Sequence, residues 1–135
     1  MDAEMKTIAR TCLDGAAADT MTFPEIVGAL SAAGFESYVA DLRRSVVTYY
    51  LPSGESLELP SHATHAAVAS RLDLAAVRAA IHEAQTLAPG YSYRGFCAKV
   101  MSAGVAGYMV SFSGRRAVYF ARTGETHVEL FPTVA

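Results

Sequence analysis

The sequence predicts an α+β protein made of a duplicated ααβββ unit, with antiparallel strands and pseudo-two-fold symmetry. Residues 23–59 align without a gap with residues 93–129, at an offset of 70 positions. Chance would give roughly two or three identities in such an alignment. The identities found are Ala33/Ala103, Gly34/Gly104, Tyr38/Tyr108, Tyr49/Tyr119, Gly54/Gly124 and Glu55/Glu125. We therefore expect two superposable halves that meet at a seam, where ligand clefts readily form.

Length and composition favour a single domain over residues 1–135, with one repeat over 1–60 and the other over 73–132. A chain of 135 residues buries about two thirds of its unfolded surface. Its 52% hydrophobic and 18% charged residues are typical of a folded chain. The net charge of −2 and the pI near 6.0 give no field that attracts nucleic acid or an anionic membrane. We expect neither partner.

The first half is predicted to begin with two helices. Apolar residues recur at helical spacing over 3–18. Thr22, Pro24 and Glu25 form the pattern of an N-cap, an early proline and a capping box. Gly34 stands where a glycine commonly ends a helix, and the φ angle there is expected to be positive. The second helix therefore runs from about residue 23 to Gly34.

Three strands follow, over 37–42, 46–51 and 56–59. The run VVTYYL is rich in β-branched and aromatic residues, which favour strands. The links through Arg43-Arg44 and the PSGE turn are too short for a crossover, so neighbouring strands should pair antiparallel. Residues 61–72 are expected to form a connector that holds at most a helical turn.

The second half repeats this order. Asp73 is a plausible N-cap for a helix over 74–87. A fourth helix is expected over 93–103, with Gly104 ending it at a positive φ angle. The strands are predicted over 105–112, 117–122 and 126–131.

The fifth strand is apolar on both faces. Val118 and Phe120 point to one side and Ala117 and Tyr119 to the other. A sheet of this kind is usually covered twice. We expect helices on one face, and the other half or another subunit on the second.

Four tyrosines occupy matching strand positions in the two halves: Tyr38, Tyr49, Tyr108 and Tyr119. One interpretation is core packing with the hydroxyl groups at the rim. The other is an aromatic groove at the pseudo-two-fold axis that binds a flat apolar or aromatic ligand. Tyr49 and Tyr119 are the best candidates, because they lie on the middle strand of each half.

Arginine pairs stand at the first hairpin of each half, Arg43-Arg44 and Arg115-Arg116. Exposed arginines in salt bridges are one interpretation. A clamp for phosphate or carboxylate is the other, since guanidinium groups bind these anions with two hydrogen bonds. Because no further cluster of basic residues surrounds these pairs in the sequence, they make a poor nucleic-acid site.

Histidines and acidic residues give two further candidates. His62 and His65 form an HxxH pattern, but no third ligand stands at a suitable spacing, so no metal site is predicted. Glu125, His127 and Glu129 share one face of a strand. They form either a solvated face or an acid/base cluster.

Nucleophile and cofactor motifs are absent from the sequence. It contains no GxSxG, no Walker A motif and no Rossmann glycine pattern, so no cofactor and no catalytic residue is predicted. Cys12 and Cys97 lie on separate predicted helices, and Cys97 stands in an apolar stripe where thiols are usually inert. With no signal peptide in residues 1–20 and no apolar stretch of membrane-spanning length, the expected location is the cytoplasm.

Four motifs carry a family resemblance: FPE at the start of a helix, AGxxSY at the first strand, VTYYLPxGE, and TGETHVE near the end. Together they resemble the YbcV-like family of small bacterial and prophage-encoded proteins, from Thr22 to Pro132. Its members often carry the label phage envelope protein and are otherwise described as a domain of unknown function. The resemblance implies a compact, phage-associated cytosolic domain and brings no catalytic residues with it.

Three functional hypotheses follow. The leading one is a non-enzymatic ligand-binding or regulatory module, in which the seam holds a small molecule or a protein partner. Its site would include the four strand tyrosines, with Arg115 or Arg116 contacting an anion. The second is a small enzyme that uses Glu125, His127 and a nearby tyrosine. The third is a homo-oligomer with a structural role.

Overall fold

A computed structural model describes residues 1–62 and 66–132. The first half comprises α1 (Ala3–Ala17), α2 (Phe23–Ala33), β1 (Ser37–Asp41), β2 (Val46–Tyr50) and β3 (Ser56–Pro60). The second half comprises α3 (Leu74–Thr86), α4 (Tyr93–Ser102), β4 (Val105–Ser111), β5 (Arg116–Ala121) and β6 (Thr126–Leu130). The predicted α+β class and the repeated ααβββ order are confirmed.

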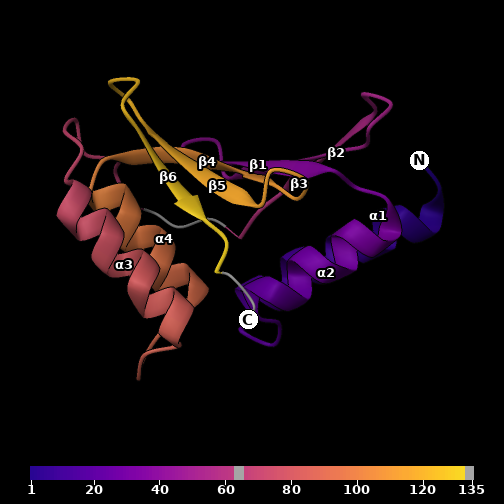
Figure 1. Cartoon of the computed structure of the whole chain (residues 1–135), viewed down its shortest axis with the longest axis horizontal. Coiled ribbons are helices and arrows are strands. Elements are labelled where there is room, and N and C mark those ends of the chain that lie inside the picture. Colours follow the sequence, from indigo (N-terminus) through magenta and orange to yellow (C-terminus); the bar gives the residue numbers. More distant parts are fainter. Residues whose placement is uncertain (63–65, 133–135) are drawn as a thin grey trace.

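The strands form one antiparallel sheet in the order β3-β2-β1-β4-β5-β6. Figure 1 shows the helices on one side of this sheet, so the described molecule has two layers. The halves join edge to edge through β1 and β4, the central pair of strands. The expectation that one half covers the second sheet face of the other is therefore wrong, because the halves share a sheet instead of stacking two.

The register between β1 and β4 reveals the pseudo-two-fold axis. Val39 pairs with Met109, which lies 70 positions later and is its own equivalent in the second half. The pairs around it exchange under the same offset: Ser37–Ser111, Tyr38–Val110, Ala40–Tyr108 and Asp41–Gly107. The axis therefore passes between Val39 and Met109. Within the halves the register also repeats, with Tyr38 opposite Tyr49 and Tyr108 opposite Tyr119.

The helix ends follow the local sequence. Thr22 accepts a hydrogen bond from the backbone N–H of Glu25, whose carboxylate accepts one from the N–H of Thr22, so the capping box is confirmed. Asp73 caps α3, as predicted. Gly34 and Gly104 follow α2 and α4 with φ angles of 107° and 98°. Both positive φ angles are confirmed, and they let the chain turn sharply from helix to strand.

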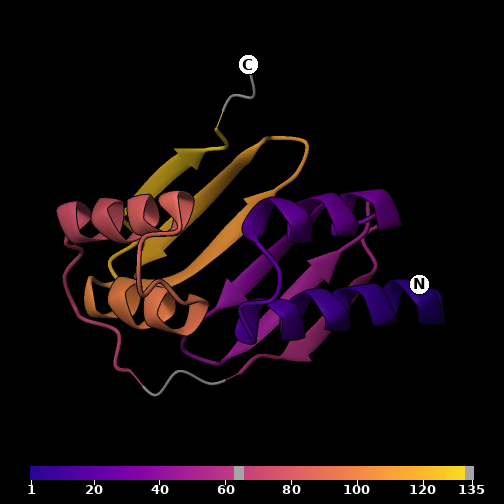
Figure 2. The same cartoon turned by 90° about the horizontal axis from the view of Figure 1, so that it is seen from below.

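Both halves contribute to one hydrophobic core. The helix-facing side of the sheet packs against the helices, and the largest fully buried side chains include Leu30, Val77, Val100, Val105 and Val110. Figure 2 shows each helix pair over the strands of its own half. The line between the helix pairs therefore runs over the junction of β1 and β4, and this line is the seam.

The connector between the halves is held by hydrogen bonds to the second half. The N–H of Ala69 donates to the carbonyl of Met101, and that of Asp73 to the carbonyl of Ala103. Arg122 Nη1 donates to the carbonyl of Val68 over 3.1 Å. Residues 61–62 and 66–72 contain no helical turn. Within the described ranges, no helix has the length and apolar character needed to cross a membrane.

Candidate functional site

The four predicted tyrosines come together from both halves, and they lie inside the core. Tyr38, Tyr49, Tyr108 and Tyr119 are only 3–8% exposed. Their rings form a row across the seam, with centroid distances of 5.7, 6.3 and 5.4 Å between successive rings. Burial raises the pKa of each phenol above its ordinary value, so all four are neutral at physiological pH.

The predicted arginine pair lies at the β4–β5 turn. The guanidinium of Arg115 sits over the ring of Phe131, 5.7 Å from its centroid. Arg116 is exposed, and its Nε donates to the carbonyl of Gly114 over 3.1 Å. In the other half, Arg44 forms an exposed ion pair with Glu58 at 3.4 Å. Of these arginines, Arg44 makes the exposed salt bridge that one interpretation expects, while Arg115 and Arg116 make contacts within their own turn and with Phe131.

The predicted acid/base group is brought together only in part. His127 Nε2 lies 3.1 Å from Glu129 Oε2, and its ring stacks on Tyr119. Gln85 donates to the other carboxylate oxygen of Glu129. Glu125 instead accepts a hydrogen bond from the hydroxyl of Thr123 in the preceding turn, at 2.7 Å. The strand therefore presents a His–Glu pair, with Glu125 engaged elsewhere.

A pocket lies at the seam. It has a volume of about 30 Å³ and is lined by α1, the β1–β2 hairpin, the start of the connector, and α4. Residues of the first half supply mainly apolar walls, such as Leu13, Leu42 and Val47, while the second half supplies Tyr93, Arg94, Cys97 and Met101. A cavity of this size holds about two water molecules or a head group of similar size.

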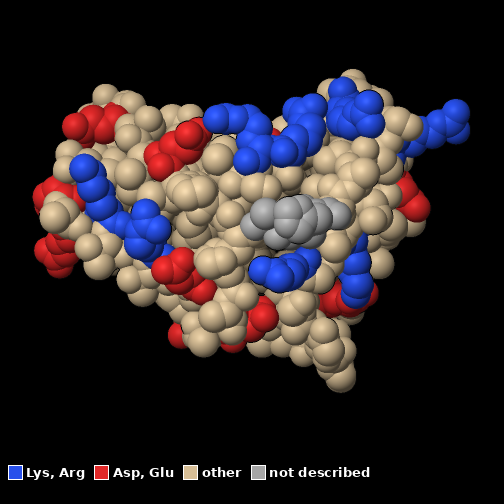
Figure 3. All heavy atoms as spheres, turned by 180° about the vertical axis from the view of Figure 1, so that it is seen from behind, with Lys and Arg blue, Asp and Glu red and all other residues tan. Residues whose placement is uncertain are grey.

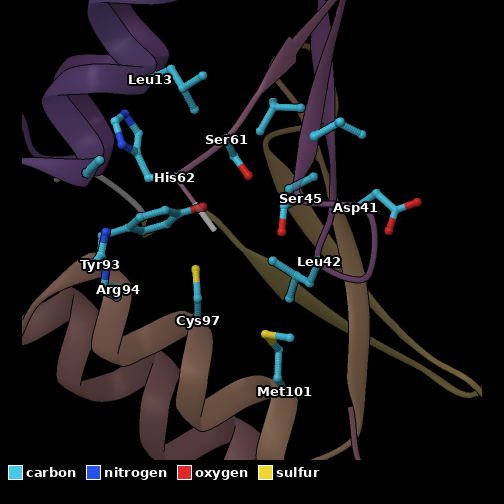
Figure 4. A pocket seen from close by; sticks show the side chains of 14 residues that line it. Leu13, Asp41, Leu42, Ser45, Ser61, His62, Tyr93, Arg94, Cys97 and Met101 are labelled. Atoms are coloured by element: carbon cyan, nitrogen blue, oxygen red, sulfur yellow. The ribbon is translucent and has the colours of Figure 1, made fainter. Parts of the chain in front are cut away.

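Several polar side chains converge on the pocket. Figure 4 shows the hydroxyl of Tyr93 and the thiol of Cys97 directed into one common space, with Ser45 and Ser61 on the opposite wall, while the ring of His62 turns toward α1. The ring of His62 is half-exposed and lies 3.2 Å from the carboxylate of Asp14. The pocket therefore combines hydrogen-bonding groups with an apolar wall, as small-molecule sites usually do.

Tyr93 connects the pocket to the core. Its hydroxyl lies 2.5 Å from the hydroxyl of Tyr108, and Tyr93 lines the pocket together with Cys97. The position of Tyr93 is set by both halves, since its N–H donates to Asp19, in the loop after α1. Burial raises the pKa of Cys97 to about 11, so the thiol stays protonated at neutral pH. A protonated thiol is a weak nucleophile and serves here as a hydrogen-bonding group.

The pseudo-symmetric counterpart of this pocket carries aromatic rings, of which Phe23 is 42% exposed. At an offset of 70, Ser61 corresponds to Phe131, Leu42 to Phe112, and Tyr93 to Phe23. The rings of Phe23 and Phe131 pack edge to face at 5.5 Å. Phe112 packs against Tyr38 at 6.1 Å. The same backbone arrangement is thus open and polar on one side of the axis, and packed on the other.

None of the residues predicted as a binding site lines the seam pocket. Of those that do, the sequence suggests Cys97 only as a candidate nucleophile and His62 only as a candidate metal ligand. Tyr93 and Ser61 carried no motif. The signal that points to this site is the repeat alignment extended to position 61. There, Ser61 of the first half aligns with Phe131 of the second half.

In the two described ranges, no three His, Cys, Asp or Glu side chains come close enough to hold a metal ion. His65 of the HxxH pattern lies outside those ranges. His62 contacts Asp14.

Comparison with known families gives one match. The family model described as "Protein of unknown function (DUF1398)" matches residues 15–129, which is most of the chain. A search of curated proteins finds no match.

Proposed function

We propose that this chain, which belongs to the DUF1398 family of proteins of unknown function, binds a small molecule in the seam pocket without transforming it. The observation that carries this proposal is the difference between the two seam sites. The duplication supplies two equivalent places, and only one is packed with Phe23, Phe112 and Phe131.

Stability alone favours the packed arrangement. Filling a cavity with apolar atoms stabilises a protein, and leaving it open forgoes that gain. The open site instead holds a hydroxyl at Ser61, a phenol at Tyr93 and a thiol at Cys97. Groups of this kind fix the orientation of a bound molecule, which explains why an open, polar pocket is kept where its counterpart is closed.

The ligand class that we propose is a small organic acid. Asp41 also lines the pocket, but its carboxylate already accepts hydrogen bonds from the N–H groups of Arg43 and Arg44. Arg94 lines the pocket and offers a guanidinium, which binds a carboxylate with two hydrogen bonds. Arg43 and Arg44 lie in the turn between the pocket residues Leu42 and Ser45. Figure 3 shows Lys and Arg side chains gathered along the upper part of the molecule, seen from behind the view of Figure 1.

The chemistry of the lining supports binding and not catalysis. With a pKa near 11, Cys97 is not ionised at neutral pH. The pKa of Tyr93 is raised well above its ordinary value, chiefly by burial, so it too holds its proton. The His127–Glu129 pair is the observation that favours the enzyme alternative. We rank it second, because neither residue lines the pocket.

We extend the proposal to a regulatory role in the cytoplasm, and to the prophage association that the YbcV-like resemblance implies. Both halves line the pocket, so a ligand would stiffen the contact between them. The free thiols of Cys12 and Cys97 fit a reducing compartment. Cell fractionation of the producing organism tests the location, and recovery of the protein with the membrane or periplasmic fraction would contradict it.

The binding proposal is tested by NMR titration of the isotope-labelled protein with short-chain carboxylic acids and their amides. We expect shifts at Leu42, Ser61 and Cys97 with the acids. Arg94→Gln should weaken the binding of the acids about tenfold, or about 1.4 kcal/mol, and leave the binding of the amides unchanged.

The filled variant Leu42→Phe/Ser61→Phe carries the residues of the packed site and should lose binding while it stays folded. The reciprocal Phe112→Leu is the matched control and should bind as the wild type does. Shifts centred on Tyr49 and Tyr119, and lost in Tyr49→Ala/Tyr119→Ala, would instead support the tyrosine groove. Binding that survives in the filled variant would sink the seam-pocket proposal.

A further inference from the structure

The sheet face opposite the helices is apolar and open. Strand alternation places Met109 on this face, since its neighbours Tyr108 and Val110 are buried on the helix side. Exposed apolar side chains on it are Tyr50 (36%), Met109 (37%), Val128 (45%) and Leu130 (60%). Val39, Val118 and Phe120 lie between them and are half-buried. A continuous apolar surface of this kind marks an interaction site.

The apolar character is concentrated on the second half. Glu58 and Pro60 of β3 correspond to Val128 and Leu130 of β6, and Thr48 of β2 corresponds to Val118 of β5. Charged residues and proline protect an edge strand from unwanted association. The first half keeps that protection and the second half lacks it. We call the face formed by Met109, Val118, Phe120, Val128 and Leu130 the β4–β6 outer face.

We propose that a second copy of this chain covers the β4–β6 outer face, and that the two copies form a dimer with two-fold symmetry. The composition of the face supports this occupant. The five residues that define it are apolar, and homodimer interfaces are more apolar than the rest of a protein surface.

The charged group on this face also fits a second copy. Arg116 and Phe120 lie on either side of Val118 along β5 and point to the same face. Two β5 strands that face each other antiparallel around Val118 bring Arg116 of one copy over Phe120 of the other. Guanidinium groups bind aromatic faces, and the symmetry makes this contact twice. The net charge of −2 on each copy opposes association only weakly.

Light scattering coupled to size-exclusion chromatography, over a wide concentration range, tests the proposal. The wild type is expected at twice the chain mass of 14.3 kDa. The variant Val118→Thr/Val128→Glu carries the residues that the first half holds at the same register, and should run as a monomer. Leu74→Glu is the matched control, because Leu74 is equally exposed on α3, and it should stay dimeric.

A wild type that stays monomeric at the highest concentration overturns the proposal, and so does a dimer that survives Val118→Thr/Val128→Glu. Should that variant fail to fold, the wild type decides by itself. A soluble paramagnetic probe should broaden the methyl signals of Leu74 and spare those of Val128, because both side chains are exposed in the single chain. Equal broadening at the two positions would show that the β4–β6 outer face is open to solvent.

Discussion

Ser45 and Arg115 occupy the same place in the first hairpin of each half, and both adopt a positive φ angle, 54° and 50°. Gly54 and Gly124 match in the same way, at 92° and 84°. The backbone of the duplicated unit therefore repeats even where the side chains differ. Where the backbone repeats in spite of different side chains, the fold does not depend on those side chains. They can therefore differ between the halves and serve different functions.

The side chains break the symmetry in two places. At the seam, the first-half site is an open pocket with Ser61, and its counterpart is closed by Phe131. On the outer sheet face, the edge strand β3 of the first half holds Glu58, and the edge strand β6 of the second half holds Val128 at the equivalent position. The first half thus borders the proposed ligand site, and the second half carries the proposed dimer face. Each prediction below changes one member of an equivalent pair.

The largest effect is expected at the glycines that follow α2 and α4. A Cβ atom at Gly104 would lie 2.2 Å from the carbonyl oxygen of Arg71, whereas one at Gly34 would meet only Met5 Cε at 3.5 Å. Gly34→Ala adds only the backbone strain of a positive φ angle, about 1–2 kcal/mol. Gly104→Ala must also displace the connector, so we expect a loss above about 4 kcal/mol.

Urea unfolding of both variants measures the difference. Equal losses of stability at the two positions would contradict it, because they would show that the connector does not pack on Gly104. Gly28→Ala, where a Cβ atom meets nothing, is the control for the glycine change itself.

A second difference concerns alkaline pH. Cys97 corresponds to Val27 in the first half. Burial raises the pKa of its thiol from 9.0 to about 11, so as the pH rises the unfolded state loses this proton first. Stability is unaffected by the thiol below pH 9 and falls from pH 9 to about 11. In Cys97→Val, we expect the loss of unfolding free energy between neutral and alkaline pH to be smaller by roughly 2–3 kcal/mol than in the wild type.

Urea unfolding at several pH values from neutral to alkaline, on wild type and Cys97→Val, makes the test. Buried tyrosines such as Tyr38 also have raised pKa values, so some alkaline loss remains in the variant. Parallel pH curves for the two proteins would show that the thiol ionises as easily in the folded state as in the unfolded chain.

The smallest effect is expected at the hairpin pair with positive φ angles. Ser45→Gly relieves left-handed strain and should stabilise the protein by up to about 1 kcal/mol, after the entropy of glycine in the unfolded chain is subtracted. Arg115→Gly relieves the same strain but removes the guanidinium from the ring of Phe131, worth about 0.5–1 kcal/mol. Thermal unfolding should therefore show a gain for Ser45→Gly and little change for Arg115→Gly. A larger gain for Arg115→Gly would mean that its contact with Phe131 contributes nothing.

The sequence by itself determined the elements and their order. Thr22 and Glu25 predicted the start of α2, and Asp73 that of α3, because a cap acts through groups within one helical turn. Gly34 and Gly104 marked the helix ends for the same reason. The offset of 70 positions predicted the repeat, and the register of the sheet confirms it. The helix caps and ends depend on neighbours along the chain, and the repeat is read by comparing the sequence with itself.

The tertiary structure alone decided what surrounds each face. Strand alternation put Tyr49 and Tyr119 on one side of the sheet, but only the docking of the helices placed that side in the core. The halves could have stacked, yet β1 pairs with β4 and leaves the outer face open. The seam pocket likewise needs α1, β2 and α4 together. Packing between distant segments has no local period in the sequence, so only the assembled fold reveals the pocket and the open face.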